Sequence, residues 1–296
     1  MRVAIVTNIN KPKVRPAVAE LLPWIGQRAE VVGVEADTKL DLERINADSI
    51  LVLGGDGTLL STARRLKGRQ IPLMGVNFGR LGFLASFTPD EFKGHFEHLV
   101  EGKLPVASRL VLEASVIDGN ADCKLTDRAD LAAKRRWCST GLNDAVISAG
   151  SPFRMIDLML GTDSDPGVML SGDGLIVSTP SGSTAYNLAA GGPIISPNVE
   201  AICITPLSPH SLSFRPVVSS AQSTVILTAK RINRGTTLSC DGQESTNVKA
   251  GDRVVIKRAA HDVLLVENPD AREWATLAEK LNWAASPTYG VKAKNA

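Results

Sequence analysis

Short apolar strands alternate with helical patterns over the first 105 residues, and this alternation is the feature that most restricts the fold. Strand-like composition occurs at residues 3–7, 30–35, 50–53 and 71–76, and apolar side chains recur at helical spacing at residues 14–24 and 89–100. Strands that alternate with helices predict a parallel sheet covered on both faces. Ligands bind such sheets beyond the carboxyl ends of the strands, so the turns after the strands are where a site is expected.

One of these turns is rich in glycine. The apolar residues 50–53 lead into Gly-Gly-Asp-Gly-Thr at residues 54–58, and a helical pattern begins at Leu59. Glycines let backbone N–H groups approach a phosphate, and the following helix N-terminus adds partial positive charge. Asp56 is the exception, because a carboxylate repels phosphate; it suits a base that takes a proton from an attacking hydroxyl, or a ligand for a cation. A tight turn with an Asx-type hydrogen bond is the alternative for so short a motif.

A second loop follows the next strand. Residues 77–84 read Asn-Phe-Gly-Arg-Leu-Gly-Phe-Leu, in which two glycines bracket Arg80. One interpretation makes this a second ligand-facing loop with Arg80 near phosphate. A buried turn with Arg80 in solvent explains the pattern equally well.

The pattern changes after Pro105. Strand-like segments separated by turns dominate to residue 267 and predict an all-β region; they are residues 110–117, 138–147, 156–161, 174–178, 201–205, 225–229, 236–240, 253–257 and 263–266. Residues 118–136 are polar and are expected to be an exposed hairpin. Residues 272–283 form a helix whose apolar stripe, Trp274, Leu277, Ala278 and Leu281, must pack on another element.

These patterns predict an α/β N-terminal domain with a parallel sheet, an all-β C-terminal domain, and a C-terminal helix that returns to the first domain. The expected boundaries are residues 1–105 plus 268–296 for the α/β domain, which carries the Gly-Gly-Asp-Gly-Thr loop, and residues 106–267 for the all-β domain.

Two stretches of the all-β region carry polar groups suited to a ligand. Residues 173–193 place a hydroxyl-rich loop, Ser-Thr-Pro-Ser-Gly-Ser-Thr, between a buried strand and a short helix, which suits a sugar–phosphate or pyrophosphate. Tyr186 could stack on a ring. Asn143 and Asp144 interrupt an apolar strand, so at least one polar side chain is expected to enter the interior or a cleft, where ribose hydroxyls would satisfy it. The alternative for the hydroxyl-rich loop is an ordinary helix-capping loop, and the alternative for Asn143 and Asp144 is a turn or bulge. Asp241-Gly242 predicts a hairpin turn.

Composition excludes several classes of function. The net charge is +2 and aromatic residues make up 4% of the chain, so neither nucleic acid nor a membrane surface is an expected partner. No run approaches the roughly 18 apolar residues of a membrane span. The four cysteines form no C-x-x-C pair and the four histidines no metal pattern, which favours a cytoplasmic protein with reduced thiols.

The ordered set of motifs resembles the bacterial NAD kinases over roughly residues 1 to 285. It comprises the motifs at 54–58 and 77–84, Leu-Asn-Asp at 142–144, Asp-Gly-Leu at 173–175, Ser-Thr-Pro-Ser-Gly-Ser-Thr-Ala-Tyr at 178–186, Pro-His-Ser-Leu at 209–212 and Asp-Gly-Gln at 241–243. Diacylglycerol and sphingosine kinases share Gly-Gly-Asp-Gly-Thr, whereas the block at 178–186 is far more specific.

The resemblance implies phosphorylation of the adenosine ribose 2′-hydroxyl of NAD by ATP with Mg²⁺, in a homodimer or homotetramer whose sites borrow residues from a neighbouring subunit. It implies that Asp56 is the catalytic base. It assigns phosphate or ATP contacts to Gly54, Gly55, Gly57, Thr58 and Arg80. It assigns NAD contacts to Asp56, Gly57, Asn143, Asp144, Arg154, Asp173, Thr184, Ala185, Tyr186, Asn187, Leu188, Ala189 and Gln243. It gives no protein ligand for the metal.

One departure from the family pattern concerns charge. Many bacterial members have an arginine two residues before Asp-Gly-Leu, where this chain has Ser171. A lipid kinase of the diacylglycerol or sphingosine type is the alternative enzyme, and a catalytically silent dinucleotide-binding module is the alternative without chemistry. The intact Asp56 argues against the silent module, and the chain lacks an amphipathic basic helix for a lipid surface.

Overall fold

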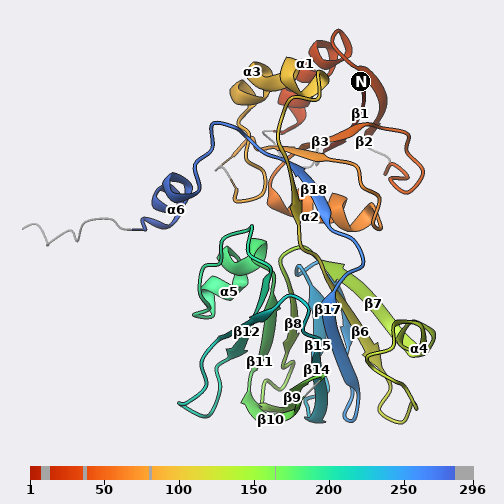
Figure 1. Ribbon diagram of the computed structural model, residues 1–296, viewed down its shortest axis with the longest axis vertical. Helices are drawn as coiled ribbons and strands as arrows, with labels where there is room; N and C mark the ends of the chain where they lie inside the picture. The colour runs from red at the N-terminus through yellow and green to blue at the C-terminus, as the bar shows by residue number, and fades with distance from the viewer. Residues whose placement is uncertain (8–13, 36–38, 80–81, 164, 284–296) are drawn as a thin grey trace, which may run out of the picture.

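The described strands form three sheets of six strands each, one in the upper part of Figure 1 and two packed together in the lower part. The computed structural model describes residues 1–7, 14–35, 39–79, 82–163 and 165–283. The expected phosphate contact Arg80 and the end of the chain from residue 284 lie outside these ranges.

The upper sheet has the order β2-β1-β3-β4-β18-β5, and its strands pair in parallel except β5, which runs antiparallel to β18. Its strands are β1 (Arg2–Thr7), β2 (Glu30–Glu35), β3 (Ser49–Leu53), β4 (Leu73–Val76), β5 (Val106–Arg109) and β18 (Val263–Val266). The parallel sheet predicted for the N-terminal part is confirmed. However, β5 and β18 come from the stretch that was expected to be all-β.

Helices cover both faces of this sheet, as predicted. Helices α1 (Val14–Gly26) and α3 (Pro89–Val100) pack on the face that carries Val3 and Ile5. Helix α2 (Asp56–Arg65) packs on the opposite face, which carries Ala4 and Val6, because successive side chains of a strand point to opposite faces. In Figure 1, α2 lies between the sheet and the lower part of the molecule.

The start of α2 differs from the prediction, which placed it at Leu59. The helix begins at Asp56, and Gly55 is its N-cap in an extended conformation. An acidic residue in the first turn is stabilised by the positive end of the helix dipole. The glycine turn is therefore shorter than expected, and Asp56 belongs to the helix.

The lower part is a sandwich of two antiparallel sheets. One has the order β10-β9-β14-β17-β6-β7 and the other β13-β12-β11-β8-β15-β16. The first contains β6 (Leu112–Ile117), β7 (Arg135–Gly141), β9 (Ile156–Thr162), β10 (Asp165–Gly172), β14 (Val225–Arg231) and β17 (Arg253–Arg258). The second contains β8 (Asp144–Ser148), β11 (Gly174–Ser178), β12 (Ala201–Leu207), β13 (Val217–Ser220), β15 (Thr237–Cys240) and β16 (Glu244–Asn247).

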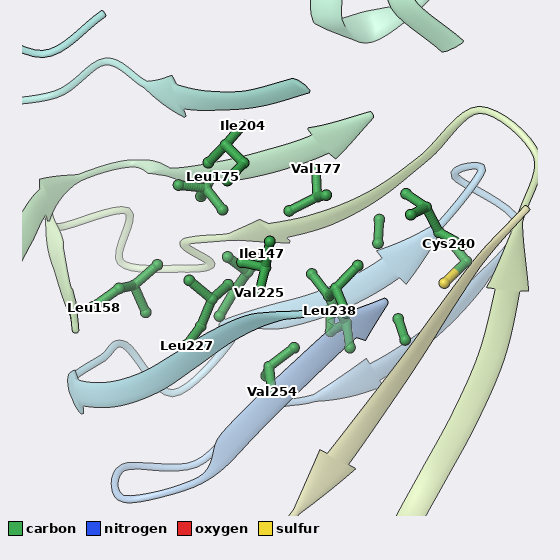
Figure 2. Close-up of a cluster of buried hydrophobic side chains, with 14 of the residues drawn as sticks. Ile147, Leu158, Leu175, Val177, Ile204, Val225, Leu227, Leu238, Cys240 and Val254 are labelled. Carbon is green, nitrogen blue, oxygen red and sulfur yellow. The ribbon is translucent and has the colours of Figure 1, made fainter. Parts of the chain in front are cut away.

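Alternate residues from the two sheets form the sandwich core. Figure 2 shows Leu227 and Val254 from one sheet directed toward Ile147 and Leu238 from the other. The outer face of β8, β11 and β12 is also apolar, and Val146 and Ile176 pack there near Ala190, which follows the short helices η1 (Ser181–Thr184) and α5 (Tyr186–Ala189). These helices are therefore anchored at the end of the sandwich nearest the upper sheet (Figure 1).

Two strand predictions in this part were wrong. The single strand expected at residues 138–147 is two strands, β7 and β8, in different sheets, separated at Leu142 and Asn143. The expected hairpin at residues 118–136 contains a helix, α4 (Arg128–Lys134), whose N-cap Asp127 accepts hydrogen bonds from the amides of Ala129 and Asp130. Leu131 of α4 is buried with Cys123 against Ile117 of β6 and Val255 of β17, so this excursion packs on the outer face of the sandwich.

The last described helix, α6 (Glu273–Leu281), contacts both parts. The preceding segment is tied to the upper part, because Asn268 donates to Ser86 O at 3.1 Å and His95 Nε2 lies 2.8 Å from Asp270 Oδ2. Ser196 of the lower part donates to Glu273. The predicted packed stripe is wrong in detail: Leu277 is buried, but Trp274 is 68% exposed.

All four cysteines are free thiols. Among the described helices, none has the length and apolar character needed to cross a membrane.

Candidate active site

The carboxylate of Asp56 is held by the backbone of the loop after β4. Its Oδ2 accepts a hydrogen bond from the Phe83 amide at 3.0 Å, and its Oδ1 accepts one from the Ala85 amide at 2.9 Å. A Cβ atom at position 82 would lie 1.9 Å from Oδ1, so this approach requires Gly82. A carboxylate oxygen has two acceptor positions. Each Asp56 oxygen therefore keeps one position for a ligand, in an orientation that the backbone fixes.

The glycine turn presents backbone amides at the start of α2. The Gly55 carbonyl accepts from the amides of Thr58 and Leu59, whereas the amides of Gly55, Asp56 and Gly57 have no hydrogen-bond partner among the described residues. Three consecutive amides at a helix N-terminus are an anion-binding arrangement. The turn is close-packed, because a Cβ at Gly54 would lie 2.7 Å from Thr58 Oγ1.

Asn143 and Asp144 lie where β7 ends and β8 begins, and their amides bind Asp241. The Asp241 carboxylate accepts hydrogen bonds from the amides of Leu142, Asn143 and Asp144 at 3.0, 2.7 and 3.2 Å. Asp144 itself is buried, and this burial together with the Asp241 charge raises its pKa to about 7. The alternative of a turn is confirmed for this stretch, and Asp144 also enters the interior.

Asp241 and Gly242 form the turn between β15 and β16, with φ of 51° and 63°. The predicted hairpin turn is therefore confirmed. Sequence reasoning missed the second role of Asp241, because a turn residue gives no sign of which distant amides it binds.

Most of the hydroxyls in the 178–184 loop are hydrogen-bonded within the protein, which the sequence did not indicate. Thr179 Oγ1 donates to the Leu142 carbonyl and accepts from the Gly182 amide. Ser183 Oγ is bonded to Pro180 and Ile195. These bonds join the loop to the β7–β8 junction and give it a fixed shape, and Ser181 and Thr184 are its hydroxyl residues that line a cavity.

The short helix after this loop has one buried and one exposed side chain of interest. Asn187 donates to the carbonyls of Ser183 and Pro193 and accepts from Thr205 Oγ1 at 2.6 Å, so its amide is fully engaged within the protein. Tyr186 is 50% exposed and is free to contact a ligand. Ala185 is the N-cap of α5, Leu188 is half-buried and Ala189 is exposed.

Gln243 connects the glycine turn to the sandwich. Its Nε2 donates to the Gly57 carbonyl at 2.8 Å, and its Oε1 accepts from Arg64 Nη1 at 2.9 Å. Arg64 also lies 3.7 Å from the Glu244 carboxylate. We call Gln243 and Arg64 the clasp, because they join α2 to the β15–β16 turn.

A cavity of about 360 Å³ lies between the two parts and α6. Gly82 and Phe83 line it from the upper part, Ser181 and Thr184 from the lower part, and Lys280 from α6. Its volume is in the range of small-molecule sites. Because the Phe83 amide binds Asp56, the cavity adjoins the fixed carboxylate.

Of the expected site residues that the structure describes, Thr184 is the one that lines this cavity. Two others lie far from Asp144 as well. Arg154 is exposed in the loop between β8 and β9, and Asp173 is exposed just before β11. The antiparallel register pairs Ser178 with Asp144 and Gly174 with Ser148, so Asp173 lies at the opposite end of these strands from Asp144. At about 3.4 Å per residue this separation is roughly 14 Å or more. Within one chain these two residues are not brought to the cavity.

Sequence reasoning missed the position of Lys280 at the cavity. A lysine in the last turn of a C-terminal helix is ordinary, and its place at the cavity follows only from how α6 is attached.

Two protein-family models match this chain. The ATP-NAD kinase N-terminal domain model matches residues 34–104, and the ATP-NAD kinase C-terminal domain model matches residues 142–268. A protein named NAD kinase from Rhodopirellula baltica is 35% identical over 283 residues, which cover 96% of this chain and 87% of the relative.

Solved structures show the same likeness. Yeast NADH kinase, solved in complex with NADH, superposes with a TM-score of 0.83 at 25% identity, covering 98% of this chain and 90% of the yeast chain. An NAD kinase from Archaeoglobus fulgidus in complex with ATP has a TM-score of 0.67 at 26% identity, covering 91% of this chain and 94% of the other.

Proposed function

This chain belongs to the NAD kinase family, and from that premise we propose how its residues carry out the reaction. The enzyme phosphorylates NAD with ATP at the adenosine ribose 2′-hydroxyl and produces NADP. The observation that supports a catalytic site in this chain is the Asp56 carboxylate, fixed by two backbone amides beside a cavity lined by both parts of the molecule.

Asp56 acts as the base. The 2′-oxygen attacks the γ-phosphorus of ATP, its proton moves to a free acceptor position of the Asp56 carboxylate, and the bond to the leaving oxygen of ADP breaks. Positioning and charge stabilisation do most of the work in phosphoryl transfer. The amides of Phe83 and Ala85 supply the positioning, because they leave the carboxylate one orientation.

The free amides of Gly55, Asp56 and Gly57 bind phosphate oxygens of ATP, with Gly54 and Thr58 shaping the turn. Arg80 stays in the proposed phosphate-binding set because of its position in the sequence motif.

The described residues include no group of three or more His, Cys, Asp or Glu that could hold a metal. A Mg²⁺ bound mainly by phosphate oxygens and water needs only one or two carboxylates, and Asp56 is the carboxylate at this turn. The chain thus fits a Mg²⁺ delivered with ATP, which would neutralise phosphate charge.

NAD binds along the 143–144 junction and the 184–189 segment. We infer that Asn143 and Asp144 accept or donate hydrogen bonds to ribose hydroxyls and that Thr184, Ala185, Tyr186, Leu188 and Ala189 line the dinucleotide. Asn187 contributes by fixing this segment, since its amide is engaged. Gly57 completes the set, and Gln243 contributes by fixing Gly57 through the clasp.

Arg154 and Asp173 serve a site in another copy of the chain. Their separation from Asp144 along the strands supports a homodimer or homotetramer in which one protomer offers these residues to the nicotinamide end of NAD bound by its partner.

Two domains and a cytoplasmic location complete the proposal. The boundaries expected from sequence are 105/106 and 267/268. Because β5 and β18 pair within the upper sheet, we place these two boundaries instead at about residues 110 and 262.

Four free thiols support a cytoplasmic location, because the cytoplasm is a reducing compartment.

The test is NADP formation by purified protein given NAD, ATP and Mg²⁺, read with an NADP-specific dehydrogenase. Asp56→Asn keeps the shape but loses the base, so kcat should fall about 10²- to 10⁴-fold while NAD binding by calorimetry stays within about threefold. Glu279→Gln, an exposed change on α6, is the control. Normal turnover by Asp56→Asn would remove the proposed base. NAD binding without turnover in the unaltered protein would favour the silent binding module, and loss of both would return the lipid kinases to consideration.

A further inference from the structure

Lys280 places a cation at the cavity from outside both parts of the fold. It lies in the last turn of α6, its side chain is half-buried, and its Nζ lies 4.4 Å from the centroid of the Phe83 ring. Phe83 is the residue whose amide binds Asp56 Oδ2. Lys280 and Asp56 therefore bind the same residue, one through its ring and the other through its backbone.

The charge of Lys280 has no carboxylate partner at close range. The described residues that line the cavity include two cations, Arg109 and Lys280. Arg109 is paired with Glu267 at 2.5 Å and also donates to Asn198 at 3.0 Å. Lys280 forms no ion pair with a described residue, although the Asp56 carboxylate is near enough to oppose the fall in its pKa that burial causes. A half-buried ammonium without a partner costs free energy that an anionic ligand would offset.

The packing of α6 gives no other reason for this placement. Leu277 is the buried residue of the helix, and Trp274 is 68% exposed. The ammonium of Lys280 lies over the face of the Phe83 ring, where a cation is attracted by the ring electrons. The helix thus directs a cation into the cavity while most of its own surface remains in solvent.

We propose that Lys280 binds the transferred phosphoryl group, both as it moves to the ribose 2′-oxygen and afterwards as the 2′-phosphate of NADP. This inference rests on the proposed function and adds a residue to it. The bond from the 2′-oxygen to phosphorus forms, the bond from phosphorus to the ADP oxygen breaks with its electron pair, and the hydroxyl proton goes to Asp56. Lys280 keeps its protons and contacts the non-bridging oxygens of the phosphoryl group.

The consequence is a difference between substrate and product. NAD has no phosphate at the 2′-position and NADP has one, so the Lys280 ammonium stabilises NADP binding selectively. A charge-assisted hydrogen bond of this kind corresponds to a change of about ten- to a hundredfold in affinity.

The test compares Lys280→Met, Lys280→Arg and a matched control, Lys230→Met on the exposed side of β14, in the full chain. Methionine keeps an unbranched apolar stem against Phe83 and removes the charge. We expect Lys280→Met to lower kcat about ten- to a hundredfold and to raise the NADP dissociation constant at least tenfold, with the NAD dissociation constant changed less than about twofold. Lys280→Arg should recover most of the NADP affinity, and Lys230→Met should match the unaltered protein.

Unchanged kcat and NADP affinity in Lys280→Met would overturn the inference. Equal weakening of NAD and NADP would also overturn it, since that result indicates a general effect on α6. The proposed function fails separately, if the unaltered protein makes no NADP. In that case a tenfold preference for NADP over NAD that Lys280→Met abolishes would still establish the 2′-phosphate site.

Discussion

At the scale of single residues, the pair Asp144 and Asp241 places two carboxylates in a buried position. Asp241 is compensated, because three backbone amides donate to it. Asp144 is not compensated in this way, and burial together with the neighbouring Asp241 raises its pKa to about 7. Ribose hydroxyls would supply the donors that Asp144 lacks, so the protein without NAD holds this carboxylate at a cost in stability.

Because the buried Asp144 carboxylate lowers the stability of the NAD-free protein, Asp144→Asn should change the free energy of unfolding in a way that depends on pH. In the unfolded chain Asp144 ionises near its ordinary pKa of 3.8, and in the folded protein it ionises only near 7. The stability of the unaltered protein should therefore fall as the pH rises between these values and level off above. Asp144→Asn should have little effect below about pH 4 and should stabilise the NAD-free protein by up to about 4 kcal/mol above pH 7. Urea unfolding at several pH values measures this difference.

A matched control should show the opposite sign. Arg231 and Ser171 hold the pKa of Asp157 below its ordinary value. Asp157→Asn should destabilise the protein at neutral pH, and this effect should vanish on acidification, where the unaltered carboxyl is also protonated. A stabilisation by Asp144→Asn that does not change with pH would contradict the account of Asp144.

At the scale of elements, the clasp fixes how helix α2 meets the β15–β16 turn. Gln243 donates to the carbonyl of Gly57, which is in the first turn of α2, and accepts from Arg64, which is near its end. The same turn carries Asp241, which holds the junction of Asn143 and Asp144. One turn thereby sets the position of the phosphate-binding amides relative to the NAD-binding residues.

Loss of the clasp should affect catalysis more than binding. Gln243→Ala removes two hydrogen bonds, and we expect kcat to fall about tenfold while the NAD dissociation constant changes less than about threefold. Gln243→Glu keeps the acceptor for Arg64 and loses the donor to Gly57, so its kcat should be intermediate. Steady-state kinetics and calorimetry separate the two effects. A large loss of NAD affinity with unchanged kcat would instead indicate that Gln243 acts as a direct contact of the dinucleotide.

The elements that sequence reasoning found and missed differ in their local signals. Strands β2 and β11 and helix α3 were predicted at their observed bounds, because β-branched residues mark the strands and Pro89 with the acidic residues Asp90 and Glu91 marks the start of the helix. The break between β7 and β8 was missed, because Leu142 continues the apolar pattern and the turn is held by Asp241, which is distant in sequence. Strands β5 and β10 were missed because one is short and the other contains Pro and Gly.

Prediction of the candidate site from the sequence was limited in the same way, to residues that a local pattern marks. Asp56 and the glycine turn were predictable because a phosphate-binding turn requires those residue types in sequence. The amides of Phe83 and Ala85 that orient Asp56, and the lysine of α6, depend on contacts between distant segments. No local pattern encodes such contacts.

At the scale of the whole molecule, one chain places its proposed NAD contacts at two ends of the sandwich. Asp144 lies near the upper part, whereas Asp173 lies at the far end of the same strand pair. A shared site between two copies of the chain satisfies both assignments.

Mixed oligomers test this arrangement. Asp56→Asn and Asp173→Ala should each be inactive alone. Coexpressed at equal levels, they should recover about a quarter of the unaltered activity in a dimer, because half of the dimers are mixed and each mixed dimer has one intact site. Asp56→Asn mixed with Lys280→Met should show no recovery, since both residues act within one protomer. Activity of the first mixture at the level of its separate components would exclude the shared site.

The pairing of β18 with β4 has a consequence for how the protein is made. Residues 73–76 are synthesised early, yet their neighbour in the sheet, residues 263–266, leaves the ribosome only after the entire sandwich has been translated. Until then the start of β4, at Leu73, is an open edge, although every strand of the sandwich has already been translated. Strand β18 is therefore the last strand of the upper sheet to emerge, and premature termination before residue 263 leaves a chain with an edge able to pair with other chains.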